Sequence, residues 1–227
     1  MAIFKNSAPI VTNGLILYLD AANPQSYTSG SSIYNDISGN NNSGSLISTS
    51  YSTANGGNII YNSTSSVITY PSITFTNQPY TLEFCGRIEG PIDSSNRRSL
   101  FLNPTYAGEL TNVSTYFTNF ICDSVPLYFN FGMSRPVPTG SLYFHWVCTV
   151  DSSKILTIYL NNNVVHNTSI LTTYSTISCT FTRFGNWSGN SRVYSGSLGY
   201  IRIYNKALSQ AEVTQNYNVM KSRFNLN

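Results

Sequence analysis

Short runs of alternating apolar and polar residues follow one another along most of the chain. They are rich in Val, Ile, Thr, Tyr and Phe, and clusters of Gly, Pro, Asn and Ser separate them. Because successive side chains of a strand point to opposite faces, each run predicts a β-strand, and many in succession are typical of a sandwich or barrel. The expected strands are 15–20, 81–88, 116–122, 127–131, 142–151, 155–160, 164–167, 177–184 and 198–204.

The same pattern predicts a tight hairpin and a strand with a strongly apolar face. Asn161–Asn163 separates two of the expected strands, and Asn tolerates the left-handed backbone conformation that tight hairpins need. In the strand 142–151 every second residue is apolar, so this face is expected in the core. Its members are Phe144, Trp146, Cys148 and Val150.

One helix is expected, at the C-terminal end. Ser209 and Glu212 have the spacing of a capping box, and Leu208 and Val213 have that of a hydrophobic staple. Apolar residues then recur every three or four positions, which predicts a helix with one apolar face docked on the sandwich. These residues are Val213, Tyr217, Met220 and Phe224.

Charge is scarce, which narrows the range of partners. Charged residues make up 9% of the chain and the formal net charge is +3, whereas Ser, Thr and Asn together exceed a third of the residues. Arg97–Arg98 is the one adjacent basic pair, so a phosphate-binding face and a nucleic-acid partner are not expected. No run approaches 18 apolar residues and the N-terminal segment lacks the apolar region of a leader, so we expect neither membrane insertion nor a signal peptide.

The four cysteines are widely spaced, and none forms a Cys-x-x-Cys pair, which argues against a zinc site. The burial habit of cysteine favours small buried side chains with reduced thiols. A disulfide framework is the alternative. The cysteines are Cys85, Cys122, Cys148 and Cys179.

Segments at both ends and in the centre carry a family likeness. They are Gly14–Tyr27 and Tyr34–Gly44, then Phe144–Asp151 and Tyr159–Val165, and finally Gly199–Asn218, which runs on through Arg223. In this order they resemble the laminin-G-like, concanavalin A-like jelly-roll domain found in many structural proteins of tailed-phage virions. The likeness covers residues 14–223.

The resemblance implies an all-β fold in which two antiparallel sheets form a jelly-roll sandwich with a short C-terminal helix at about 209–223. It places one domain over 14–227. Residues 1–13 are either an arm that adds to a neighbouring subunit's sheet or an ordinary first strand. Family members often carry an Asp-rich segment after the first long loop, but Ile59–Ile68 contains no acid. That departure argues against an acidic metal or catalytic site there.

No catalytic residues are assigned. A glycosidase needs two carboxylates at a defined separation, and the nearest candidates, Glu83 and Glu89, lie six residues apart with no acid between them. We expect Glu83 on the solvent face of its strand, near Arg87. For a Ser–His–Asp triad, His145 and His166 are the available histidines, and no Gly-x-Ser-x-Gly turn precedes a helix. The chain is therefore expected not to be an enzyme.

Calcium is the one cofactor to weigh. The turn Asp36–Asn42 is rich in oxygen ligands, and Asp20 and Asn23 are expected near it. The alternative is an Asx turn in which Asp36 accepts hydrogen bonds from its own backbone. Because carboxylates are few, no metal ligands and no cofactor are assigned, and a structural calcium is left open.

Sugar binding suits this composition, because neutral glycans are held by aromatic stacking together with amides and hydroxyls. Trp187 lies in a loop of small polar residues, so it is a candidate stacking platform, with Asn186 and Asn190 as hydrogen-bond donors. The alternative is a tryptophan folded over the edge of the sandwich. These three are the predicted ligand-binding residues.

The function expected from the resemblance is that of a non-enzymatic phage virion protein, a head decoration, fibre or tail component that displays a lectin-like domain. Its expected partners are other virion proteins and host-surface glycans, with a homo-oligomer left open. Its expected location is the virion, after synthesis in the host cytoplasm. The alternatives are a free carbohydrate-binding lectin module and a cement protein with no ligand.

Overall fold

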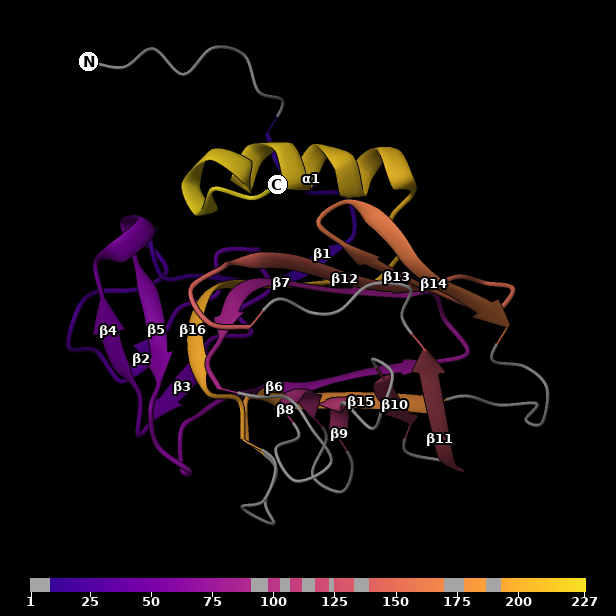
Figure 1. Ribbon diagram of the computed structural model, residues 1–227, viewed down its shortest axis with the longest axis horizontal. Coiled ribbons are helices and arrows are strands. Elements are labelled where there is room, and N and C mark those ends of the chain that lie inside the picture. Colours follow the sequence, from indigo (N-terminus) through magenta and orange to yellow (C-terminus); the bar gives the residue numbers. More distant parts are fainter. Residues whose placement is uncertain are drawn as a thin grey trace.

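The computed structural model describes residues 9–90, 98–102, 107–111, 117–122, 125–132, 139–169, 178–186 and 193–227. For Thr168 and for the strands between residues 102 and 132 it describes the backbone only. The described strands form two sheets of eight strands each. Within each sheet, every pair of neighbouring strands is antiparallel. The two sheets face each other as the layers of a sandwich (Figure 1). The predicted two-sheet all-β fold is therefore confirmed.

The first sheet has the order β14-β13-β12-β7-β16-β5-β4, and β1 also pairs with β16. Strand β16 has a different neighbour along each half of one edge: Gly196–Leu198 pairs with β5, and Tyr200–Tyr204 pairs with β1. The strands are β1 (Leu15–Asp20), β4 (Ser50–Ser52), β5 (Asn58–Tyr61), β7 (Tyr80–Ile88), β12 (Phe144–Val150), β13 (Ile155–Leu160), β14 (Asn163–Ser169) and β16 (Gly196–Tyr204).

The second sheet has the order β11-β10-β9-β8-β15-β6-β3-β2. The strands are β2 (Ile33–Tyr34), β3 (Gly44–Ile47), β6 (Val67–Thr76), β8 (Arg98–Leu102), β9 (Ala107–Thr111), β10 (Phe117–Cys122), β11 (Val125–Gly132) and β15 (Ser178–Phe184). The alternation pattern did not predict β6, although it has ten residues. Ile68 and Tyr70 are buried two residues apart, but the next buried side chain, Ile73, follows only after two exposed residues, Pro71 and Ser72, so the alternation is interrupted.

Aromatic and aliphatic side chains from both sheets fill the space between the layers. The face predicted from the strand 142–151 lies in this core, with Phe144, Trp146, Cys148 and Val150 all buried there. Phe84 is near its centre, with its ring 5.5 Å from that of Phe144 and 5.3 Å from that of Phe184. The predicted hairpin is confirmed too, because Asn161 and Asn162 between β13 and β14 both have positive φ.

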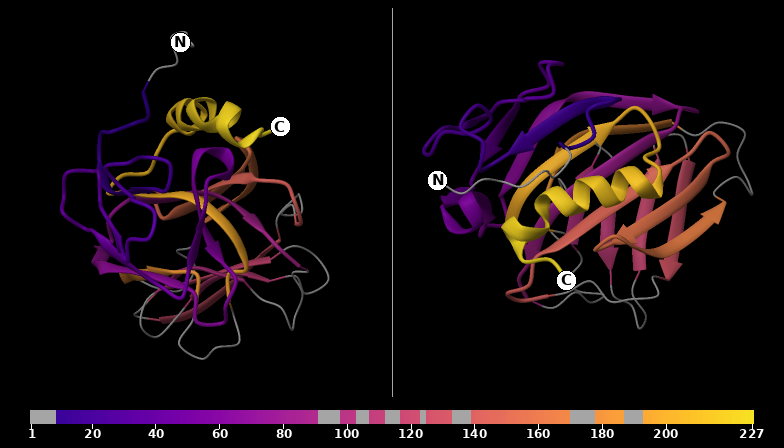
Figure 2. Two further views of the ribbon diagram at one scale, coloured as in Figure 1. Left: turned by 90° about the vertical axis from the view of Figure 1, so that its left-hand side faces the viewer. Right: turned by 90° about the horizontal axis from the view of Figure 1, so that it is seen from above.

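Helix α1 (Gln210–Phe224) lies across the outer face of the first sheet (Figure 2). Both halves of the capping box are formed, since Ser209 accepts from the Glu212 amide and Glu212 accepts from the Ser209 amide. The predicted apolar stripe from Val213 to Phe224 is buried. Beneath it, β12 and β16 are buried on both faces, because the core covers one face and the helix covers the other.

Gly199 allows the helix to approach this closely. A β-carbon at this position would lie 2.2 Å from the Phe224 ring of the helix. The β16 register also shifts between Leu198 and Tyr200, so residues on the two sides of the glycine change faces. As a result Leu198 and Ile201 point into the core, whereas Tyr200 points toward the helix.

Residues 9–13 form no strand. Val11 packs in a cluster between α1 and the first sheet, its amide donates to the Asn216 side chain, and Gln215 donates to the Pro9 carbonyl. Residues 1–8 lie outside the described residues, so the two alternatives for the N-terminal segment, an arm that adds to a neighbouring subunit's sheet or an ordinary first strand, stay untested there.

The cysteine expectation holds in part. Cys148 and Cys179 lie in the core, and Cys85 and Cys148 are free and buried. Cys179, however, is disulfide-bonded, so the expectation of reduced thiols throughout the chain was wrong.

Candidate functional site

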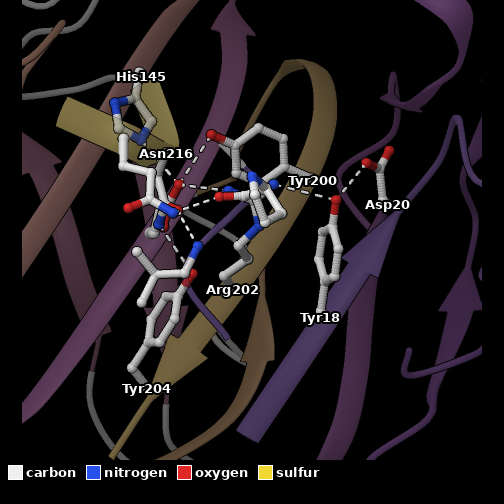
Figure 3. Close-up of polar contacts among 11 residues, drawn as sticks. Tyr18, Asp20, His145, Tyr200, Arg202, Tyr204 and Asn216 are labelled. Carbon is white, nitrogen blue, oxygen red and sulfur yellow. Dashed lines mark hydrogen bonds and ion pairs between the residues drawn. The ribbon is translucent and has the colours of Figure 1, made fainter. Parts of the chain in front are cut away.

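A cluster of buried polar side chains lies between the first sheet and α1 (Figure 3). Its centre is the carboxylate of Glu83 on β7. Oε1 accepts hydrogen bonds from Arg202 at 2.9 Å, His145 at 3.0 Å and Tyr200 at 3.1 Å, and Oε2 accepts one from Asn216 of the helix at 2.8 Å. We call this set the helix-docking cluster. It joins two strands of the sheet and the helix to one carboxylate.

Arg202 supplies the positive charge of the helix-docking cluster. Its guanidinium carbon lies 4.1 Å from the centre of the Tyr200 ring and 4.5 Å from that of Tyr18, so aromatic faces replace part of the lost hydration. Arg202 also donates to the Tyr18 hydroxyl, which donates in turn to Asp20. The charges of Glu83 and Arg202 are thus paired where water does not reach them.

The ion pair keeps Glu83 ionised despite its burial. Burial alone raises the pKa of this carboxyl, but the Arg202 charge and the hydrogen bonds from His145 and Asn216 outweigh it and lower the pKa from 4.5 to about 2. Since an ionised carboxylate only accepts hydrogen bonds, the His145 Nε2 atom donates. The expectation that Glu83 lies on the solvent face near Arg87 was wrong, because α1 covers that face and Glu83 is 0% exposed.

This geometry stabilises the fold and does not suit catalysis. Glu83, His145 and Arg202 are all fully buried, so no substrate reaches them. His145, fully buried and hydrogen-bonded to Glu83, holds a structural position. Asn216, which is not part of the predicted apolar stripe, also accepts from the Val11 amide and donates to the Tyr204 hydroxyl. Its position between Val213 and Tyr217 on the apolar face of the helix was the signal that could have identified it.

The candidate calcium ligands are occupied by groups of the chain itself. Asp36 accepts from the Tyr18, Ser38 and Asn42 amides and from the Ser38 hydroxyl, which is the Asx-turn alternative. Asp20 accepts from Arg223, as well as from Tyr18 and the Ala22 amide. Within the described residues no three Asp, Glu, His or Cys side chains gather as a metal-binding group.

A pocket of about 430 Å³ lies at the end of the sandwich where β2 and β3 of the second sheet approach β4 of the first. We call it the edge pocket; these strands are at the left in Figure 1. Residues within 27–32 and 46–51 line it, and none of the lining side chains is charged. The lining consists of serine and threonine hydroxyls, Leu46, a glycine and two tyrosines.

The two tyrosines of the edge pocket differ in role. Tyr27 is buried, and its ring lies between Tyr34 of β2, at 5.7 Å, and Tyr51 of β4, at 5.0 Å. It therefore bridges the edges of the two sheets and contributes a buried side chain to the pocket lining. Tyr51 is only half-buried, so part of its ring is available to a ligand.

The walls of the edge pocket are tied together by Arg223 of α1. Its guanidinium donates to Asp20 at 2.7 Å, and to the carbonyl oxygens of Asn55 and Gly57 at 2.9 Å each. Asp20 precedes the loop that carries Tyr27, and Asn55 lies in the turn that follows β4. The helix thus holds both segments in place. No strand was predicted in either segment, and a tyrosine within each of two serine-rich stretches was the available signal.

The residues predicted to bind sugar are only partly described. Asn186 is buried, and its side-chain NH₂ group donates to the Thr64 carbonyl, so this amide is engaged within the chain. Trp187 and Asn190 lie outside the described residues. Their role in ligand binding, and that of Asn186, stays a prediction.

Residues 62–214 match the family model described as the concanavalin A-like lectin/glucanases superfamily, so the chain belongs to this family. The two-layer architecture agrees with that assignment. No curated protein sequence matches the chain significantly. In the described part of the chain, no helix is long and apolar enough to span a membrane.

Solved structures share the fold at low sequence identity. Domain 4 of an extracellular arabinanase from Geobacillus stearothermophilus, in complex with arabinotriose, aligns with a TM-score of 0.67 at 16% identity, over 89% of this chain and 98% of that domain. The binding domain of Paraclostridial Mosquitocidal Protein 1 has a TM-score of 0.65 at 18% identity, over 92% of this chain and 52% of that one. Trypanosoma rangeli sialidase in complex with sialic acid has a TM-score of 0.66 at 11% identity, over 95% of this chain but only 34% of the sialidase. These likenesses establish the concanavalin A-like fold.

Proposed function

We propose that this chain is a non-enzymatic, carbohydrate-binding lectin-like domain, carried on a phage virion as a head decoration, fibre or tail component. The observation that supports the absence of catalysis is that every acidic side chain that the structure describes accepts a hydrogen bond from within the chain. These acids are Asp20, Asp36, Glu83, Glu89, Asp151 and Glu212.

Binding is favoured over hydrolysis for this reason. A glycosidase needs one carboxylic acid and one carboxylate about 5 to 9.5 Å apart on either side of a sugar. Here the most strongly perturbed acid, Glu83, is sealed beneath α1. What the surface does present, in the edge pocket, is hydroxyl groups and a partly exposed aromatic ring. Those groups bind the hydroxyls and apolar faces of sugars without any chemical step.

One fold neighbour lends support. The arabinanase domain, which aligns over 98% of its own length, was solved with arabinotriose. At such low identity this structure supports sugar binding only as an expectation for the fold. The virion setting rests on the resemblance of the end and central segments to phage structural domains, and a neutral, polar composition is compatible with an outward-facing particle component.

A glycan array probed with the purified, fluorescently labelled chain tests the sugar-binding part of the proposal. We expect selective binding to a subset of glycans, with no release of reducing sugar during prolonged incubation. A blank array together with stoichiometric binding to purified capsids would instead support a cement protein without a ligand. Turnover of any arrayed glycan would contradict the non-enzymatic assignment. Immunogold electron microscopy of phage particles tests the virion setting separately.

A further inference from the structure

We infer that the edge pocket is the saccharide site of this domain and that it takes an uncharged sugar. The inference rests on the proposed function, and it assigns the site to residues other than the predicted Trp187, Asn186 and Asn190. All segments that line the pocket are described, and they come from both sheets. No side chain of the helix-docking cluster contributes to it.

The lining matches a neutral saccharide in size and chemistry. A volume of about 430 Å³ falls within the range of small-ligand sites, roughly 300–1,000 Å³. Hydroxyl side chains both donate and accept hydrogen bonds, as sugar hydroxyls do, so either orientation of the partner is satisfied. Ser29, Ser32 and Ser50 are exposed, while Tyr51 and Leu46 are partly exposed and add apolar surface to the lining.

The absence of charge from this lining selects against acidic sugars. A carboxylate that leaves water needs a cation or several donors to replace its hydration. The nearby charged residues Asp20 and Arg223 bind each other at 2.7 Å and do not line the pocket. A sialic or uronic acid would therefore lose hydration at this site without gaining an ion pair.

The pocket is also held in one shape before any ligand arrives. Ser48, in the connection that crosses from β3 to β4, has a φ of 51°, a left-handed conformation unfavourable for serine. Such strain persists only where the surrounding structure holds it, and it is frequent at binding sites. In the turn between β4 and β5, Gly57 lies close to Ala21, so that a β-carbon on Gly57 would be 2.3 Å from the Ala21 carbonyl oxygen. Together with the Arg223 contacts, this close packing keeps the ordering cost of binding low.

Two variants of the edge pocket test the inference by calorimetric titration with the strongest neutral glycan from the array. Ser32→Trp places a large ring in the pocket from an exposed position, and Tyr51→Ala removes the partly exposed ring. Each is expected to weaken binding about tenfold or more. Ser45→Trp is the matched control, because Ser45 is exposed on β3 but does not line the pocket. It should leave the affinity unchanged, and circular dichroism should show that all three variants fold.

Different results would contradict the location of the site, the class of ligand and the proposed function. Binding that survives both pocket variants but is lost on Trp187→Ala would overturn the location and leave the carbohydrate-binding function intact. Binding of sialylated glycans in preference to neutral ones would overturn the ligand class. An array on which the wild-type chain binds no glycan would overturn the proposed function and, with it, this inference.

Discussion

Replacing the buried Glu83 by Gln should lower the free energy of unfolding far more than the same substitution at an exposed glutamate. The substitution keeps the shape of the side chain but removes the charge that pairs with Arg202. It also brings an NH₂ group against donors, since both carboxylate oxygens already accept hydrogen bonds from the chain. Arg202, which is 0% exposed, would be left without its anion.

The expected size of the effect follows from two estimates. Lowering the pKa of Glu83 from 4.5 to about 2 corresponds to about 3 kcal/mol of stability at neutral pH. Breaking one partner of a buried ion pair typically costs about 3–5 kcal/mol. Both agree on a loss of about 3–5 kcal/mol in the free energy of unfolding, a large share of the roughly 5–15 kcal/mol of a typical domain.

Urea unfolding at pH 7, followed by circular dichroism, measures this loss. The matched control is Glu89→Gln, because Glu89 pairs with Arg87 at the surface and its side chain is 51% exposed; we expect a loss below about 1 kcal/mol. The double replacement Glu83→Leu with Arg202→Met should be less damaging than Glu83→Leu alone, since it leaves no buried charge unpaired. Equal effects of the Gln replacements at positions 83 and 89 would refute the importance of the helix-docking cluster.

The Glu83 carboxylate should also make the stability of the domain depend on pH, with a loss of stability in acid. Because the pKa of Glu83 is lower in the folded chain than in the unfolded chain, its contribution to stability is complete above pH 4.5 and disappears as the pH falls toward 2. The difference in stability between the wild type and Glu83→Gln should therefore shrink over this interval. A difference that stays constant down to pH 2 would show that Glu83 is not held ionised.

Three further predictions concern the backbone, the helix cap and the thiols. Gly57→Ala should cost more stability in urea unfolding than Gly30→Ala: both glycines have positive φ, which strains alanine, but a β-carbon also meets the Ala21 carbonyl at 2.3 Å in the first case and nothing within 4 Å in the second; equal losses would contradict the close packing. Ser209→Ala should cost about 1 kcal/mol through the lost helix cap, and an unchanged urea midpoint would speak against it. Cys85 and Cys148 should resist alkylation in the folded protein and react in urea, because burial raises the pKa of both thiols; rapid labelling in peptide maps of the folded chain would be inconsistent with their burial.

Local patterns in the sequence determined much of the fold. The alternation in the strand 142–151 assigned Phe144 and Trp146 to the core, and the capping box and apolar stripe located α1 within one residue of its start. These features succeed because strand and helix periodicity is a property of neighbouring residues, which any stretch of sequence displays. Strand β6 escaped because Pro71–Ser72 breaks its period in the middle.

Only the tertiary structure decided what the polar residues do. Alternation placed Glu83 on the face away from the core, correctly, but could not reveal that α1 covers that face and brings Asn216 to it. The edge pocket likewise combines segments about twenty residues apart from two different sheets, and Arg223, far along the chain, joins them. Whether a polar side chain meets water, a charge or a ligand depends on which distant elements pack against it, and local periodicity carries no information about that packing.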